Sequence, residues 1–348
     1  MSQTVAPARP LDERLATRSP LQRLLGRPEI GALVGAVVLF VFFAIIADTF
    51  RDPDAFATVL YSSSTIGIMA VSVALLMIGG EFDLSAGVMV TTAALTASMF
   101  SYQLSLSLWV GVLVSLAVTL VLGFFNGLLL VRTGLPSFIV TLGTFFMLAG
   151  LNLGVTKMVT GNVATPSISD MDGYALAKNI FAADLNVFGV SVKITVLWWI
   201  LFAAVATWVL LRTRAGNWIF AAGGAAPSAR AVGVPVGRTK IALFMGVAFT
   251  AWFSGMHLLF AFSTVQSGEG VGNEFLFIIA AVVGGCLLTG GYGSAIGSAI
   301  GALIFGMASK GIVFAEWNPD WFKFFLGAML LAATVVNTVI RRRAEASK

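Results

Sequence analysis

Two carboxylates interrupt a long apolar run in the first third of the chain. Glu81 and Asp83 lie within residues 77–87, which read Met-Ile-Gly-Gly-Glu-Phe-Asp-Leu-Ser-Ala-Gly. A charged side chain at the centre of a bilayer costs about 2.5 to 3.5 kcal/mol on insertion scales, so such residues usually mark a transport pathway or a helix break. The two carboxylates therefore indicate either titrating groups along a transport pathway or side chains that support a broken helix.

Asp83 and Ser85 stand just before or within the first turn of the helix that we expect to follow. A carboxylate or hydroxyl at that place accepts hydrogen bonds from unpaired backbone N–H groups and lies at the positive end of the helix dipole. We interpret Asp83 as a cap of a broken helix. Glu81 has no obvious partner in the sequence, and we expect it to face a transport path.

The elements that must position these residues are membrane helices. The chain has 348 residues, of which 58% are hydrophobic and 11% are charged, and its mean hydropathy is +0.95. That composition leaves too little polar surface to cover a soluble globule, so it predicts an integral membrane protein in contact with the lipid bilayer. The net charge of +5 comes from basic residues next to helix ends, which indicates topology rather than a nucleic-acid partner.

Because a span needs about 20 mostly apolar residues, the apolar runs predict an all-α membrane protein with about ten transmembrane helices. The helices are expected roughly at residues 30–47, 58–78, 84–100, 108–131, 136–155, 190–211, 241–262, 275–288, 294–313 and 322–340. The third and the eighth are short, so we expect at least one broken helix that does not cross fully.

Most basic residues fall on one side when the N-terminus is placed in the cytoplasm, and this bias sets the orientation. The cytoplasmic parts are then the N-terminal segment (1–29), Arg132, the loop 212–240 and the C-terminal tail (341–348). Both termini are expected to be cytoplasmic, with a transmembrane domain at 30–340 between them.

Two loops are long enough to carry function. The loop 156–188 is expected to fold over the outer mouth. In the cytoplasmic loop, Pro227 occupies a plausible first helical position and Gly233 is a stop signal, which predicts a helix of about two turns. A helix this short is marginal in water, so it needs something to pack against.

Glycines recur beside the apolar segments, where they permit tight turns and close approach of helices. Gly297 and Gly301 have the GxxxG spacing of closely packed membrane helices. The glycines expected to serve turns or helix packing are Gly79, Gly80, Gly87, Gly284, Gly285, Gly290, Gly291, Gly293, Gly297 and Gly301.

Recognisable catalytic motifs do not occur. The sequence has no Walker A loop, no HExxH, no paired Cys or His at metal spacing and no GxSxG elbow. We therefore expect neither an enzyme nor a cofactor or metal site, and energy for transport would come from an ion gradient or a partner. His257, the only histidine, is expected to be a satisfied or lumen-facing polar residue.

Four motifs follow one another along the chain. They are Gly79, Gly80, Asp83, Leu84, Ser85 and Gly87; Asn126 and Gly127 with Pro136, Phe138, Ile139, Thr141, Leu142 and Gly143; Ala221 or Ala222, Gly223, Gly224, Ala229, Arg230 and Gly233; and Glu274, Ile279, Ala280, Ala281, Gly284, Gly285, Gly290, Gly291, Gly293 and Ser294. In this order they resemble the permease subunits of ABC importers for ribose, xylose and related sugars. The resemblance spans about residues 33–342, but Glu81 replaces a common Gly and Ala225 a common Asn.

The resemblance implies a multi-pass permease of the cell inner membrane that translocates a pentose or hexose by alternating access. Its implied partners are ABC ATPase subunits that bind ATP, a second permease copy in a homodimer or heterodimer, and a periplasmic or lipid-anchored substrate-binding protein. The candidate substrate pathway comprises Glu81, Asp83, Ser85, Asn126, Thr141 and Glu274. The candidate coupling residues toward the ATPase are Gly223, Gly224, Ser228, Arg230 and Gly233.

Other functions remain open at this point. An ion-coupled secondary transporter would use Glu81 and Asp83 as its titrating pair. A related ABC permease would instead carry nucleosides or branched-chain amino acids. A membrane-embedded enzyme is the least favoured class, because no nucleophile, base or metal cluster is apparent.

Overall fold

The computed structural model describes residues 28–105 and 107–346. This part of the chain is mostly helical, and seven of its helices are long and apolar enough to cross a membrane. The predicted class, an all-α membrane protein, is confirmed. The cytoplasmic segment predicted at residues 1–29 lies almost wholly outside the described residues.

Each of the ten predicted helices has a counterpart near its expected place. The described elements are α2 (Pro28–Ile46), η2 (Asp48–Arg51), α3 (Pro53–Ile78), α4 (Ala86–Tyr102), α5 (Leu108–Thr133), α6 (Ser137–Thr160), α7 (Tyr174–Phe181), β1 (Asp184–Val187), β2 (Val190–Lys193), α8 (Thr195–Arg212), α9 (Arg214–Gly224), α10 (Ala226–Ala231), α11 (Val236–Phe262), α12 (Asn273–Val283), α13 (Ala295–Phe314) and α14 (Trp321–Ala346). The third and eighth predicted helices are indeed short, because α4 has 17 residues and α12 has 11.

Several boundaries differ from the prediction. Helix α3 begins at Pro53 rather than near residue 58, and α12 ends at Val283 rather than near residue 288, because the Gly284–Gly285 pair stops it. Residues 190–193 form β2, which pairs antiparallel with β1, so the predicted helical start at Val190 is wrong. The alternation Val-Ser-Val-Lys is a strand pattern, and α8 begins only at Thr195. Helix α9 is an additional element that the apolar runs do not predict, and α14 continues to Ala346 rather than ending near residue 340.

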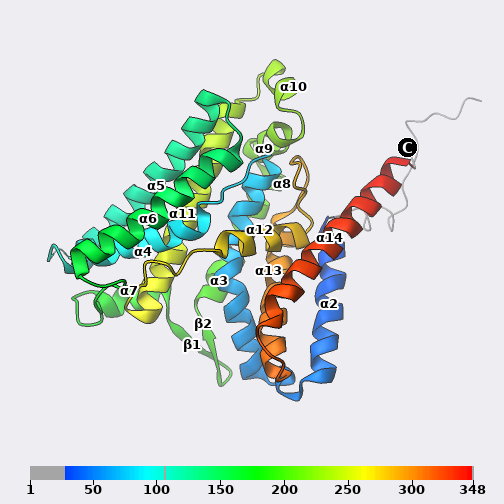
Figure 1. The fold of residues 1–348 in the computed structure, drawn as a ribbon. Coiled ribbons are helices and arrows are strands. Elements are labelled where there is room, and N and C mark those ends of the chain that lie inside the picture. The colour runs from blue at the N-terminus through cyan, green and yellow to red at the C-terminus, as the bar shows by residue number, and fades with distance from the viewer. Residues whose placement is uncertain (1–27, 106, 347–348) are drawn as a thin grey trace, which may run out of the picture.

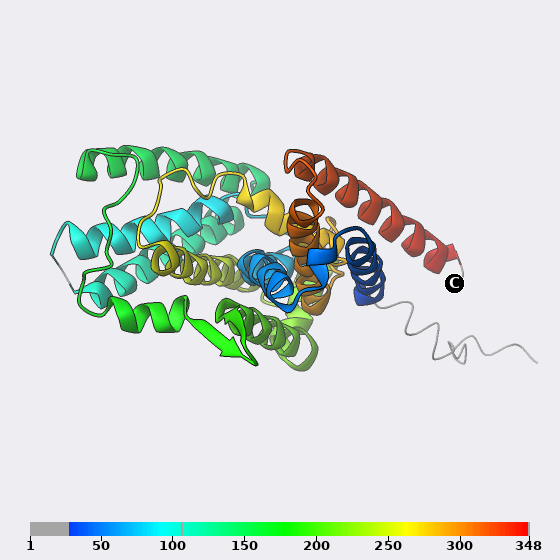
Figure 2. The ribbon, with the colours of Figure 1, turned by 90° about the horizontal axis from the view of Figure 1, so that it is seen from below.

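Helices α3, α4, α11 and α13 form the interior of the bundle. In α11, 72% of the most apolar stretch is buried within the protein, whereas the corresponding value for α2 is 17%. Helices α4 and α5 pack against α11 on one side, and α2 packs against α13 on the other. Figures 1 and 2 show α2 and α14 together at one edge of the bundle, with α5 and α6 at the opposite edge.

The two ends of the bundle carry different connections. Helix α10 lies at one end, and the β1–β2 hairpin with α7 lies at the other (Figure 1). We call these the α10 end and the hairpin end. At the hairpin end, the segment after α6 pairs with the segment after α11, because Thr165 N–H donates to the Val265 carbonyl (3.0 Å). The loop predicted at 156–188 is thus largely structured.

Helices α3 and α12 end in the same way. Each is followed by a glycine pair whose second member has positive φ, +84° at Gly80 and +94° at Gly285. In both cases the next residue donates its N–H five positions back, from Glu81 to Leu76 (3.1 Å) and from Cys286 to Ala281 (3.0 Å). Such left-handed glycine termini stop a helix cleanly. The chain then turns and starts α4 or α13, so the fold contains two matching helix breaks.

Candidate functional site

Asp83 lies in the first of these breaks, between α3 and α4, and is completely buried. Its Oδ1 accepts hydrogen bonds from the Ser85 N–H (2.8 Å) and the Ser85 hydroxyl (2.5 Å). Its Oδ2 has no partner among the described residues. The carboxylate therefore supports the backbone just before α4, and it does so from a position earlier than a standard N-cap.

The hydroxyl of Ser85 continues this arrangement toward α5 and α6. It accepts a hydrogen bond from Asn126 Nδ2 (3.1 Å), and Asn126 Oδ1 accepts one from the Thr144 hydroxyl (2.6 Å). All of these side chains are buried. Buried polar groups in a membrane need such partners, because neither lipid nor water can supply them there.

The start of α6 holds the backbone of the same break. The Phe82 N–H donates to the Ser137 hydroxyl and the Leu84 N–H donates to the Thr141 hydroxyl, each at 3.1 Å. We call Asp83, Ser85, Asn126, Thr141 and Thr144, together with Ser137, the break network. Ser137 and Thr144 are not among the residues predicted from the sequence, although their spacing from Thr141 places all three on one helix face.

Glu81 points to a different neighbour. Its carboxylate forms an ion pair with Lys240 at the start of α11, and the two side chains are only 11% and 14% exposed. The sequence suggests no partner for Glu81, because Lys240 is far away along the chain. In the sequence, Lys240 serves only as one of the basic residues that indicate the membrane orientation. The ion pair ties the first break to the α10 end of α11.

Glu274 lies at the start of α12 and is 2% exposed. Both of its carboxylate oxygens accept from the Gly272 N–H, at 3.2 and 3.1 Å. A methyl group at Gly87 would overlap its Oε2, so the carboxylate packs against the first turn of α4. Glu274 thus adjoins α4 one turn beyond Asp83, and no hydrogen bond to the break network occurs among the described residues.

Both breaks touch the C-terminal end of α9 through backbone atoms. A methyl group at Gly223 would overlap the Ile78 carbonyl oxygen, and one at Gly290 would come within 2.7 Å of the Gly80 Cα. The Gly291 N–H donates to the same Ile78 carbonyl (2.8 Å). We call Gly80, Gly223, Gly290 and Gly291 the glycine junction. Three separate segments meet there at distances that only glycine allows.

The segment after α9 projects from the bundle. Helix α10 has Pro227 in its first turn, as predicted, and buries Ala229 against Ala222 and Val236. Ser228, Arg230 and Gly233 are exposed. Val232, directly after α10, is 81% exposed, so this segment exposes an apolar and a basic side chain.

Glycines also hold α13 against α12. A methyl group at Gly297 would overlap the Gly284 carbonyl oxygen, and one at Gly301 would overlap the Ala280 carbonyl oxygen. The backbones are therefore in direct contact, which is the geometry that GxxxG spacing favours.

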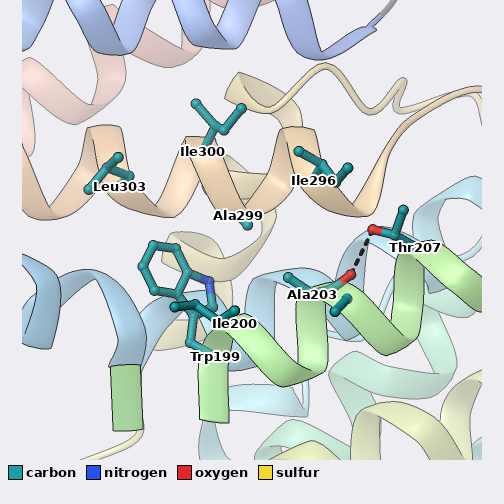
Figure 3. Close-up of a pocket in the computed structure, with 9 residues that line it drawn as sticks. Trp199, Ile200, Ala203, Thr207, Ile296, Ala299, Ile300 and Leu303 are labelled. Atoms are coloured by element: carbon teal, nitrogen blue, oxygen red, sulfur yellow. Dashed lines mark hydrogen bonds between the residues drawn. The ribbon is translucent and has the colours of Figure 1, made fainter. Parts of the chain in front are cut away.

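An apolar cavity of about 400 Å³ lies between α8 and α13. Figure 3 shows Trp199 and Ile200 facing Ile296, Ala299 and Ile300 across it. Its one hydroxyl, from Thr207, already donates to the Ala203 carbonyl (2.6 Å) (Figure 3). This cavity offers few partners to a polar solute.

Comparison with known proteins identifies the family. Residues 55–334 match the family model described as the branched-chain amino acid transport system / permease component. A probable ABC transporter permease of Sinorhizobium fredii is 30% identical over 90% of both chains. The galactose/methyl galactoside import permease of Escherichia coli is 30% identical, over 87% of this chain and 93% of the relative.

A third relative, the fructose import permease of Rhizobium meliloti, is 26% identical over 89% of this chain and 85% of the relative. No solved structure matches. These matches confirm the resemblance that the four motifs indicate. The chain therefore belongs to this family of transport-system permease components, and it is a multi-pass inner-membrane permease of an ABC importer.

Proposed function

We propose that this permease translocates a small sugar, a pentose or hexose, and that ATP hydrolysis in partner subunits drives it through α9 and α10. Relatives named for the import of galactose, fructose and ribose support the substrate class. The glycine junction carries the mechanism, because it places the C-terminal end of α9, which leads into α10, in direct backbone contact with both helix breaks. The family assignment gives no support to the ion-coupled alternative with Glu81 and Asp83 as its titrating pair, or to a membrane enzyme.

The proposed topology has ten crossings with both termini in the cytoplasm. The α10 end then faces the cytoplasm, in agreement with the basic residues Arg132, Arg212, Arg214 and Arg238 near it. Glu29, at the start of α2, accepts a hydrogen bond from the Ser294 hydroxyl (2.6 Å), which fits a common side for the starts of α2 and α13. A substrate-binding protein would dock at the hairpin end.

Coupling follows from contact geometry. An ATPase subunit that binds α10 more tightly in one conformation biases the equilibrium between inward-open and outward-open states. Because Gly223 lies directly against Ile78 and the Gly290–Gly291 turn, a displacement of α9 must displace one or both breaks. The break network holds the first break to α5 and α6, so we expect this part to move as a unit.

A second permease copy would complete the pathway, and the candidate residues Glu81, Asp83, Ser85, Asn126, Thr141 and Glu274 keep their proposed place along it. Within that set, the hydrogen bonds favour a supporting role for the break network. Glu81 and Glu274 are tied to Lys240 and Gly272 respectively.

The test is uptake into proteoliposomes that contain the permease, its ATPase and its binding protein. We expect ATP-dependent uptake of at least one of radiolabelled ribose, galactose and fructose. Radiolabelled leucine and uridine are tested in separate assays as the alternative substrates. Arg230→Ala should uncouple ATP hydrolysis from uptake, as should deletion of residues 223–233. Arg238→Ala, near the same end of the bundle but outside α10, is the matched control.

Two results would contradict the proposal. Uptake that a protonophore abolishes in vesicles without ATPase would restore the ion-coupled mechanism. Uptake of leucine or uridine in place of every sugar would replace the substrate class.

A further inference from the structure

A second cavity, of about 300 Å³, lies between α3, α4, α11, α12 and α13 toward the hairpin end. In contrast to the cavity in Figure 3, its wall is rich in hydroxyl groups, from Tyr61, Ser62, Thr65, Thr91 and Ser254. Ligand pockets in proteins span roughly 300 to 1,000 Å³, so this one suits a small molecule. None of its lining residues belongs to the break network.

Two of these hydroxyls have no hydrogen-bond partner among the described residues. The side chain of Thr91 on α4 is buried, with 1% of the residue exposed, and its Oγ1 is unpaired. The Oγ of Ser254 on α11 is also buried and unpaired. An unpaired buried hydroxyl is unfavourable, so a ligand that forms a hydrogen bond with both groups would recover that free energy.

Gly270 packs directly against the Thr91 hydroxyl. A methyl group at Gly270 would overlap the Thr91 hydroxyl oxygen, so this wall can approach Thr91 only because it lacks a side chain there. Gly270 also lines the cavity. The Thr91 hydroxyl therefore lies directly against the Gly270 backbone, and both residues line the cavity.

Tyr61 and His257 form a fixed polar pair on the same wall. The Phe181 carbonyl lies 2.9 Å from His257 Nδ1, and because a carbonyl only accepts, Nδ1 carries the proton in the neutral ring. Nε2 then accepts from the Tyr61 hydroxyl at 3.1 Å. The Tyr61 oxygen keeps its acceptor capacity for a ligand.

The charged groups at the cavity balance. Glu269 and Lys310 contribute one charge of each sign, and Asn273 adds a neutral amide with donors and acceptors. Phe277 supplies an apolar face. A neutral molecule with several hydroxyls and one C–H face matches this wall better than an ion or an aliphatic side chain.

We propose that this cavity is a binding site within a single permease chain for a monosaccharide-sized neutral polyol, contacted by Thr91, Ser254 and Tyr61. The inference rests on the proposed sugar-import function and deepens it by locating a site that precedes the helix breaks on the way inward. The site is formed by one chain alone and does not depend on a second copy.

Cysteine protection in the complete importer, reconstituted in nanodiscs, tests the site directly. Thr91→Cys should react with methanethiosulfonate ethylammonium, measured as a mass increase of this chain, and ribose, galactose or fructose should slow the reaction. The native Cys286 is buried and does not line the cavity, so it serves as the unlabelled background. Ser98→Cys is the matched control, because Ser98 is on the same helix and buried with an unpaired hydroxyl, but does not line the cavity.

The neighbouring hydroxyl gives a quantitative readout. In the Thr91→Cys background, Ser254→Ala should raise the sugar concentration for half-protection of the introduced thiol by about two- to tenfold, as expected for one lost hydrogen bond. Ser98→Ala should leave that concentration unchanged. Wild-type ATP-dependent uptake is measured in parallel.

The outcomes separate the two proposals. Protection by a transported sugar, and none by leucine, supports the site. Uptake of a sugar that gives no protection of the introduced thiol overturns the site and leaves the import function standing. Absence of both uptake and protection for all three sugars overturns both.

Discussion

Lys240 and Glu81 form an ion pair that joins the first turns of α11 to the break after α3. The two residues are 159 positions apart in the sequence, and both side chains are largely buried. Glu81 directly follows Gly80 of the glycine junction. The junction already contains Gly223 of α9, and the ion pair links it to α11 as well.

We expect loss of one partner to destabilise the protein more than loss of both. Glu81→Ala or Lys240→Ala leaves a charge without its counter-ion in a poorly solvated place, at a cost of about 3 kcal/mol, the lower end of the range for buried pairs. The double change Glu81→Gln with Lys240→Gln should recover most of the loss. The melting temperature of the detergent-solubilised protein measures this, and a double variant that melts as low as the worse single variant would contradict it.

The role of Asp83 can be separated from its charge. Asp83→Asn keeps an oxygen that accepts from the Ser85 N–H, so a supporting role predicts nearly normal stability and uptake. Asp83→Ala leaves the Ser85 N–H and the proton of the Ser85 hydroxyl without an acceptor and should cost about 1 to 3 kcal/mol. Thermal unfolding and ATP-dependent uptake of both variants decide between them. If Asp83→Asn folds normally and transports nothing, the carboxylate acts through its charge.

Gly223 and Gly224 are adjacent in sequence but have different surroundings. A methyl group at Gly223 would overlap the Ile78 carbonyl, whereas at Gly224 the nearest atom, the Gly291 Cα, is 3.8 Å away. We therefore expect Gly223→Ala to reduce ATP-dependent uptake at least about tenfold, which is a loss of about 1.4 kcal/mol in coupling. Gly224→Ala should remain near wild type. Equal uptake by the two variants, at equal expression, would remove the junction from the mechanism.

Helix positions were readable from the sequence because each apolar run is long and bounded by glycine, proline or charge, as at Gly134 after α5. The short helix α10 was also recognisable from Pro227. The hairpin residues 190–193 were misassigned because two of the four are valine and the segment lies directly before the apolar helix α8. Their strand pattern is only four residues long.

The site was only partly predictable. Asp83, Ser85, Asn126 and Thr141 carry motif signals, and the fold brings them together. The partner of Glu81 and the meeting of Gly80 with Gly223 depend on tertiary contacts between distant segments. Local periodicity and spacing contain no information about such contacts. Thr91 and Ser254 gave no signal at all, because isolated hydroxyls are common in membrane helices.

Close packing of α12 on α13 should show the same contrast between a confined and an open glycine. At Gly301 an added methyl group would overlap the Ala280 carbonyl oxygen, so Gly301→Ala must push the two helices apart and lower the melting temperature. At Gly150 on α6 nothing lies within 4 Å, and alanine there should stabilise the helix by about 0.5 to 1 kcal/mol. Thermal unfolding of the two variants tests this. A Gly301→Ala protein that melts at the same temperature as the Gly150→Ala protein would contradict this expectation. The helices α12 and α13 beside the second break could then separate without loss of stability, and only the first break would be rigidly held.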